Sequence, residues 1–187
     1  MLEHRSALGS NQYRSDPMRQ SPDLQIIAVH DKGLLLLQSG HRAALQEVVN
    51  EVLHVALSGE QRAAVAGDCA LLWLAPTEWL LELPKDRSDP IGLALTQRLG
   101  SLGVVTDLSD GFAVFEVSGS RTPDMLMTGC SLDLALPAFP AGRVVRTKLA
   151  EVSAILWNPG NPDRFRCFID RGFAEHLRTW LDGATVA

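Results

Sequence analysis

The sequence predicts an α+β fold made of two imperfect β-α-β-β-α units related by a pseudo-two-fold axis. Short apolar runs of strand length alternate with longer runs whose apolar residues recur at helical spacing. The order of these elements in the first half recurs in the second half. Residue pairs recur as well, although common dipeptides can also recur by chance: Ser39-Gly40 before Arg42 and Ser118-Gly119 before Arg121, then Leu72-Trp73 before Pro76 and Leu156-Trp157 before Pro159.

The first expected unit covers residues 23–103 and begins with two apolar strands, 24–29 and 34–37. A helix follows Ser39-Gly-His41, because its apolar positions fall on one face: Ala44, Leu45, Val48, Val49, Val52 and Leu53. Strands at 69–74 and 79–83 are joined by the short connection 75–78, as in a hairpin. A second helix runs from Asp89-Pro90 to Leu99, with proline in the first turn, where its missing N–H costs little.

The second expected unit covers residues 104–187 and repeats this order. A strand over 105–107, a turn and a strand over 112–117 lead into a helix that ends near Gly129. A proline-rich loop at 136–142 precedes strands at 144–152, 154–157 and 165–169 and a closing helix at 173–181. In the strand 112–117, alternation places Ala113, Phe115 and Val117 on one face. We expect the two units to pack as one compact body.

Residues 1–22 form a polar N-terminal arm with few apolar residues. Such a segment does not bury enough apolar surface to offset the entropy lost on ordering. It is either a disordered tail or an arm that lies on a partner chain. In the second case the candidate interface residues are the isolated apolar ones: Leu2, Leu8, Tyr13 and Met18.

The composition is that of an ordinary globular protein, with 46% hydrophobic and 21% charged residues. The formal net charge of −5 is spread along the chain, which argues against a nucleic-acid partner, since phosphate binding needs clustered Lys and Arg. No apolar run approaches the ~20 residues of a membrane-spanning helix, so we expect no membrane partner. The first six residues are polar, unlike a secretion signal. These observations favour a cytoplasmic protein.

Few residues stand in patterns that indicate catalysis or metal binding. Cys69, Cys130 and Cys167 are odd in number and far apart, which fits neither a disulfide framework nor a zinc motif. Cys69 and Cys167 lie in apolar strands, and a nucleophilic thiol is conceivable only at Cys130. The five histidines have no metal-ligand spacing, and His176 falls on the solvent side of the last helix. We therefore predict no catalytic, cofactor-binding or metal-ligating residues in this chain.

The acidic turn at 107–111 has two possible roles, one chemical and one structural. Asp107 and Asp110 could form an acid–base pair, but aspartate in a tight turn commonly accepts hydrogen bonds from nearby backbone N–H groups. We favour the structural reading, in which Asp107, Ser109, Asp110 and Gly111 stabilise the connection between two strands. Four tryptophans could similarly line a ring-binding pocket or serve as core and interface anchors, and we favour the latter: Trp73, Trp79, Trp157 and Trp180.

Most of the chain from 24 to 182 resembles the gamma-subunit family of heterotetrameric sarcosine oxidases, a relative of the folate-dependent aminomethyltransferases (the T-proteins of the glycine cleavage system). The resemblance rests on a set of segments that are specific only together: 72–81, 105–119, 129–134 with Phe139-Pro140, 142–147 and 165–181. It implies an aminomethyltransferase-like (folate-binding domain) fold. It also implies a bacterial complex that oxidatively demethylates sarcosine to glycine, forms hydrogen peroxide and passes a one-carbon unit to tetrahydrofolate.

Within that family this chain is implied to be a non-catalytic subunit whose partners are alpha, beta and delta chains. FAD, FMN and NAD are implied to lie in or between the alpha and beta chains and zinc on the delta chain, with no cofactor bound by this chain alone. In the T-proteins a Gly-Gly turn and an aspartate pair follow the Thr-x-Leu strand and place a carboxylate near the folate. Here the stretch 147–157 has neither Gly-Gly nor Asp, and Ala154, Ile155 and Leu156 stand in its place.

Two other functions stay open. The chain could be a stand-alone folate-binding, aminomethyltransferase-like protein, or the equivalent subunit of a related N-methyl amino acid oxidase or dehydrogenase. A yellow complex with three co-purifying chains would separate a subunit from a stand-alone protein.

Overall fold

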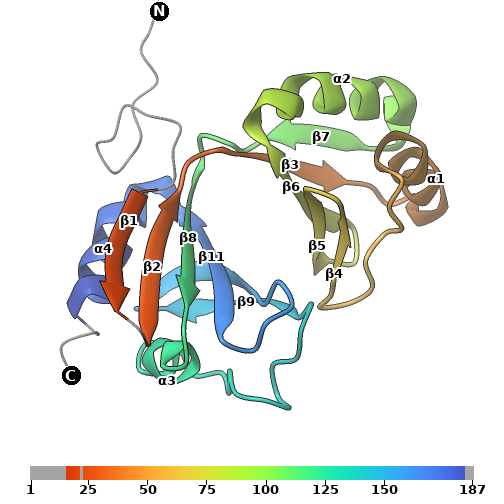
Figure 1. Cartoon of the computed structure of the whole chain (residues 1–187). Helices are drawn as coiled ribbons and strands as arrows, with labels where there is room; N and C mark the ends of the chain where they lie inside the picture. Colours follow the sequence, from red (N-terminus) through yellow and green to blue (C-terminus); the bar gives the residue numbers. More distant parts are fainter. Residues whose placement is uncertain (1–15, 22, 184–187) are drawn as a thin grey trace, which may run out of the picture. The chain divides into compact units, whose positions relative to one another are not determined.

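The computed structural model describes residues 16–21 and 23–183, which fall into two compact units (Figure 1). One unit is Lys32–Asp110. The other combines the described residues of 16–31 with 111–183. Each unit contains one antiparallel sheet. No helix within these described residues is long and apolar enough to cross a membrane.

The unit Lys32–Asp110 is built on a five-stranded sheet of order β4-β5-β6-β3-β7. Its strands are β3 (Lys32–Gln38), β4 (Ala63–Ala66), β5 (Cys69–Ala75), β6 (Glu78–Pro84) and β7 (Val104–Asp107). Its helices are α1 (Arg42–Leu53) and α2 (Ser88–Leu99), with short 3-10 turns η1 (Lys85–Arg87) and η2 (Gly100–Leu102). The expected hairpin between β5 and β6 is present.

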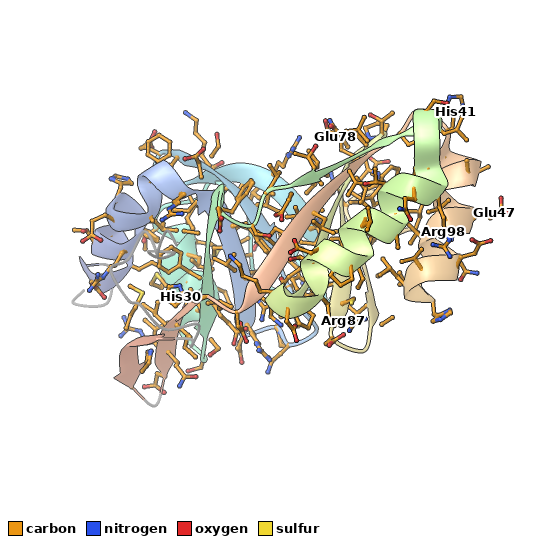
Figure 2. The ribbon with its side chains drawn as sticks, turned by 90° about the horizontal axis from the view of Figure 1, so that it is seen from above. His30, His41, Glu47, Glu78, Arg87 and Arg98 are labelled. Atoms are coloured by element: carbon orange, nitrogen blue, oxygen red, sulfur yellow. The ribbon has the colours of Figure 1, made fainter. Side chains whose placement is uncertain are left out.

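Both helices of this unit cover the same face of the sheet. Leu45 and Val49 of α1 and Leu95 of α2 are fully buried, in one core with Leu35 and Leu37 of β3. The helical spacing in the sequence therefore identified the core-facing positions of α1. The two helices lie side by side, and an ion pair joins their solvent-facing sides: Arg98, labelled on α2 in Figure 2, lies 3.5 Å from Glu51 of α1.

The second unit is built on a six-stranded sheet of order β1-β2-β8-β11-β10-β9. Its strands are β1 (Asp16–Ser21), β2 (Leu24–Val29), β8 (Phe112–Ser118), β9 (Val144–Leu149), β10 (Val152–Trp157) and β11 (Arg164–Asp170). Its helices are α3 (Thr122–Met127) and α4 (Ala174–Gly183), the latter preceded by the 3-10 turn η3 (Arg171–Phe173). Ala113, Phe115 and Val117 all enter the core of this unit, as the alternation along β8 predicted.

The two sheets share one topology, but each takes a strand from the other half of the sequence. Counted from the edge strand β4 in one sheet and from β9 in the other, the corresponding strands are β4 and β9, β5 and β10, β6 and β11, and β3 and β8. The fifth strand is β7 in the first sheet and β2 in the second. β2 pairs with β8, and β7 pairs with β3. The compact units thus differ in their bounds from the expected division into 23–103 and 104–187. Apolar patterning identifies a strand but not the sheet edge on which it pairs.

Two strands were not expected from the sequence. β1 lies within the segment expected to be an arm without strands, and it pairs with β2 as an edge strand that begins with Asp16-Pro17. Proline is tolerated there because an edge strand leaves part of its backbone unpaired. β4 is the four-residue run Ala-Ala-Val-Ala on the edge of the other sheet. The units are therefore richer in strands than the β-α-β-β-α order expected, and the pseudo-two-fold axis stays a prediction.

One of the recurring residue pairs lies on corresponding strands of the two sheets, but its side chains point in opposite directions. Leu72-Trp73 lies on β5 and Leu156-Trp157 on β10, which occupy equivalent positions in the two sheets. Trp73 packs on the helix-covered core of its unit, whereas Leu156 is the residue that enters the core of the other. Because side chains alternate along a strand, the matching dipeptides point to opposite faces.

Candidate functional site

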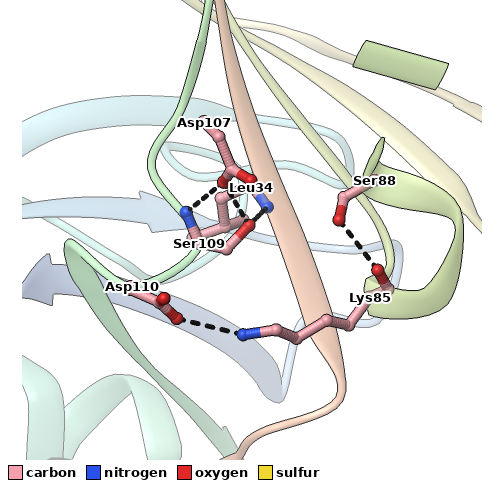
Figure 3. A network of polar contacts seen from close by, with 6 residues as sticks. All are labelled: Leu34, Lys85, Ser88, Asp107, Ser109 and Asp110. Atoms are coloured by element: carbon pink, nitrogen blue, oxygen red, sulfur yellow. Dashed lines mark hydrogen bonds and ion pairs between the residues drawn. The ribbon is translucent and has the colours of Figure 1, made fainter. Parts of the chain in front are cut away.

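The turn at 107–111 ends β7 and carries the chain from the five-stranded sheet to the six-stranded one. Asp107 Oδ1 accepts hydrogen bonds from the backbone N–H of Ser109 at 2.7 Å and from its hydroxyl at 2.5 Å (Figure 3). The Ser109 hydroxyl oxygen in turn accepts a hydrogen bond from the Leu34 N–H at 3.0 Å. The Leu108 N–H donates to the Leu34 carbonyl at 2.8 Å. These bonds fasten the turn to the beginning of β3.

Asp110 continues this network on the opposite side of the turn. Its Oδ1 lies 3.0 Å from Nζ of Lys85, which lies in η1 (Figure 3). The Lys85 carbonyl accepts a hydrogen bond from the Ser88 hydroxyl at the start of α2, at 2.8 Å. A side chain at Gly33 would approach Ser88 Cβ to 2.6 Å, so this close approach to β3 requires glycine. The turn, η1 and β3 are therefore held together by short polar contacts.

The geometry of the turn suits a structural role. The Asp107 carboxylate is exposed and engaged with Ser109, and the Asp110 carboxylate is engaged with a lysine. Gly111 belongs to the other unit, where its carbonyl accepts a hydrogen bond from the Arg171 N–H at 2.9 Å. Each end of the turn is thus anchored in its own unit. The stabilising role predicted for these four residues stays a proposal, which substitutions at Asp107 and Ser109 can test.

Of the four candidate interface residues of the arm, the structure describes Met18. Leu2, Leu8 and Tyr13 lie outside the described residues. Met18 lies in β1, where it is half-buried and packs against the core of its unit. Its apolar side chain therefore contributes to this chain's own packing.

A charged cluster that the sequence did not single out lies on the sheet face opposite this core. Glu116 of β8 lies 2.8 Å from Arg164 and 2.6 Å from Arg166, both on β11, and only 12% of its side chain is exposed. The Arg166 guanidinium also lies 5.5 Å from the centre of the Trp157 ring. Burial alone would raise the pKa of Glu116, but the two arginine hydrogen bonds outweigh it and lower the pKa. Glu116 and Arg166 lie directly opposite each other on β8 and β11, a pairing that the sequence alone does not reveal.

An open hollow of about 470 Å³ lies in the second unit. Met127 at the end of α3 and residues 128–131 after it form one side, and the β9–β10 turn with Ala150 and Glu151 forms another. His176 and Trp180 complete the lining from α4, where a spacing of four residues puts them on one helix face. His176 was expected to face solvent, and it is exposed, but its Nε2 also donates a hydrogen bond to the Ala150 carbonyl at 2.8 Å.

The three cysteines are all buried and free. Burial raises the pKa of the Cys167 thiol to about 12, and burial also raises that of Cys69. Cys130 lines the hollow with a sulfur 3.7 Å from the Thr147 hydroxyl, and no histidine is bonded to it within the described ranges. The arrangement resembles buried apolar packing more than an activated thiolate.

The tryptophans are anchors within their units. Trp79 is fully buried, and its Nε1 donates a hydrogen bond to the Ser58 carbonyl at 3.2 Å. Trp73 packs on the same core, Trp157 is buried in β10, and Trp180 is half-buried beside the hollow.

The three residues that stand in the stretch compared with the T-protein carboxylate, Ala154, Ile155 and Leu156, are buried in β10 and carry no carboxylate. Two residues of the preceding β9–β10 turn have positive φ although neither is glycine: Ala150 has φ 50° and Glu151 has φ 68°. No three His, Cys, Asp or Glu side chains among residues 16–21 and 23–183 gather as a metal site would require.

Residues 37–187 match the family model described as sarcosine oxidase, gamma subunit family. This chain belongs to the sarcosine oxidase gamma subunit family. The family model thus confirms the family that the resemblance indicated, and that family consists of enzyme subunits.

Two curated members of the family illustrate the relationship. The sarcosine oxidase subunit gamma of Arthrobacter sp. is 36% identical over 126 residues, which cover 66% of this chain and 59% of that subunit. The match thus spans less than two thirds of the Arthrobacter subunit. The subunit gamma of Corynebacterium sp. strain P-1 is 34% identical over 148 residues, covering 76% of this chain and 68% of that subunit.

Solved structures extend the comparison to the fold. A chain of heterotetrameric sarcosine oxidase from Corynebacterium sp. U-96, in complex with pyrrole 2-carboxylate, superposes with a TM-score of 0.80 and 25% identity. The match covers 89% of this chain and 85% of that one. Aminomethyltransferase T of the glycine cleavage system of Bartonella henselae matches with a TM-score of 0.60 and 16% identity, over 82% of this chain and 44% of that one. The second likeness shows a shared fold.

Proposed function

We propose that this chain is the non-catalytic gamma subunit of a cytoplasmic heterotetrameric sarcosine oxidase, assembled with alpha, beta and delta chains. In the proposed complex, sarcosine loses two electrons and its N-methyl group, which leaves glycine. The electrons reduce dioxygen to hydrogen peroxide, and tetrahydrofolate accepts the one-carbon unit. FAD, FMN, NAD and zinc belong to the other subunits. The observation that carries the proposal is the TM-score of 0.80 over 89% of this chain with a chain of heterotetrameric sarcosine oxidase.

The non-catalytic role is supported by what occupies the T-protein carboxylate position. β10 presents Ala154 and Leu156 to the core and Ile155 to the opposite face, and all three are buried. An apolar strand there offers no group that binds or transfers a proton to a one-carbon carrier. The chain's polar clusters, at Asp107–Asp110 and at Glu116, are engaged in contacts within their own units.

The experiment is purification of the complex through a tag on this chain from its native host. We expect a yellow complex that converts sarcosine to glycine with formation of hydrogen peroxide, and that forms a methylene-tetrahydrofolate when tetrahydrofolate is added. A panel with dimethylglycine and N-methylglutamate tests whether the complex is a related N-methyl amino acid oxidase or dehydrogenase. A colourless, monomeric chain from the same host would contradict the proposal.

The stand-alone aminomethyltransferase-like alternative is tested on the chain by itself. We expect the full chain alone to be colourless and to show no saturable binding in calorimetric titration with tetrahydrofolate up to millimolar concentration. A saturable site of micromolar affinity would favour the alternative.

A further inference from the structure

We propose that the hollow between α3, the β9–β10 turn and α4 is a docking pocket for an arginine side chain of a partner subunit. The inference rests on the proposed function for the existence of the partner. The chemistry of the pocket rests on three features of this unit: a carboxylate, an indole and a turn held in a strained conformation.

The carboxylate belongs to Glu151, which lines the hollow. It makes no ion pair or hydrogen bond with any residue of 16–21 and 23–183. Glu175, on the same helix as His176 and Trp180, already lies 3.7 Å from Arg178. A carboxylate in a concavity is a favourable partner for a guanidinium group, which can donate two parallel hydrogen bonds to it.

The indole belongs to Trp180, which packs directly against the backbone of Gly129. A side chain at Gly129 would approach Trp180 Cζ2 to 2.5 Å, so glycine is required for this contact. The indole is therefore held as one wall of the hollow, which Cys130 and Ser131 also line. A guanidinium plane stacks favourably on such a ring, and arginine does so more often than lysine.

The turn that carries Glu151 is held in place from two sides. Ala150 and Glu151 both have positive φ, which costs each L-residue free energy that glycine would not lose. The Ala150 N–H donates to the Gly129 carbonyl at 2.9 Å, and His176 Nε2 donates to the Ala150 carbonyl at 2.8 Å. The same elements that form the other walls thus fix the backbone from which the exposed Glu151 side chain extends. A fixed backbone reduces the entropy that this residue loses when its side chain binds a ligand.

The first arm of the test measures the chemistry of the hollow in the full chain. The probes are N-acetyl-L-arginine methylamide and its uncharged isostere N-acetyl-L-citrulline methylamide, and the readout is the indole N–H signal of Trp180 in a ¹⁵N-tryptophan-labelled sample. We expect the arginine probe to shift this signal and to bind about tenfold more tightly than the citrulline probe, because the charged hydrogen bond is lost in citrulline. Glu151→Gln should abolish that preference, and Glu175→Gln should retain it. Equal binding of the two probes, or binding of neither, would overturn the proposal.

The second arm identifies the source of the arginine. In the co-expressed complex, Glu151→Gln should weaken retention of this chain about tenfold on dilution, while Glu175→Gln leaves it unchanged. If the arginine probe binds but Glu151→Gln does not affect assembly, the occupant is not a partner arginine and the proposal fails. If the wild-type chain captures no partner at all, the proposed function fails instead, and the first arm still decides what the hollow binds.

Discussion

Leu34 and Ser109 lie 75 positions apart in the sequence, and the N–H of Leu34 donates a hydrogen bond to the Ser109 hydroxyl at 3.0 Å. The bond ties the beginning of β3, an interior strand, to the turn that follows the edge strand β7. Ser109 is oriented for it by Asp107, which accepts both the N–H and the O–H of Ser109.

Ser109→Ala removes the acceptor for the half-buried Leu34 N–H. We expect the free energy of unfolding to fall by about 1–2 kcal/mol, the usual cost of an unsatisfied buried donor. Asp107→Asn is the matched control, since asparagine retains an oxygen that accepts from Ser109, and its effect should be smaller. Urea unfolding followed by tryptophan fluorescence measures both. Equal stability of Ser109→Ala and wild type would show that the bond does not contribute to the free energy of unfolding.

Asp107→Ala separates a structural from a chemical role of the turn. Because Asp107 is exposed, we expect a loss of about 1 kcal/mol, and unchanged turnover per intact complex. The measurement is sarcosine-dependent peroxide formation normalised to assembled complex. A collapse of turnover with normal melting temperature and assembly would restore a chemical role for this carboxylate.

Glu116→Gln tests the ion-pair cluster and its dependence on pH. Because the two arginines lower the pKa of Glu116 below its ordinary value of 4.5, the folded state favours the carboxylate. Its contribution is therefore fully present above about pH 4.5 and is lost as the pH falls through the lower, folded-state pKa. We expect the variant to be about 2 kcal/mol less stable than wild type at pH 7, with the difference shrinking in acid. Glu175→Gln, at an exposed pair, should change stability little at any pH. A difference independent of pH would contradict the assignment.

Gly129→Ala tests the contact with Trp180. The added methyl group would lie 2.5 Å from Trp180 Cζ2, so the indole and α4 must shift. We expect a loss of about 2 kcal/mol, typical of overpacking. Gly59→Ala is the matched control, because nothing lies within 4 Å of a side chain placed there. Similar thermal stability of both variants would show that Trp180 is free to move.

The sequence was sufficient for most elements because their apolar periodicity is strong. The core positions of α1 and the alternation along β8 follow directly from it. The exchange of β2 and β7 between sheets did not follow, because either strand could pair on either sheet by its pattern alone. β4 was not predicted from the sequence because three of its four residues are alanine, which has little preference for strands.

The site features that sequence reasoning missed depend on contacts between distant elements. Glu116, Arg164 and Arg166 meet only because β8 and β11 are neighbours in one register. The hollow joins α3, the β9–β10 turn and α4, and the sequence showed only that the stretch 147–157, which contains this turn, has no Gly-Gly. The Asp107 turn was recognisable because its hydrogen bonds to Ser109 are local.

Truncation separates the packing of β1 from the proposed partner contact of the arm. Deleting residues 2–21 removes the pairing of β1 with β2 and the packing of Met18, so we expect lower thermal stability. Deleting residues 2–15 leaves β1 in place, and on the arm hypothesis it weakens assembly without lowering the stability of the chain. Size-exclusion chromatography of the co-expressed complex, before and after dilution, measures this. Full retention of the 2–15 deletion at low concentration would place the partner contacts on the folded units.

Native mass spectrometry of the complex purified through this chain tests the central claim most directly. The account predicts one assembly that contains a single copy of this chain with three different partner chains, and whose mass includes bound flavin. Removal of this chain from the co-expression should leave the remaining chains unable to form that assembly. A homo-oligomer of this chain, or a monomer that carries bound folate, would contradict the assignment as a gamma subunit.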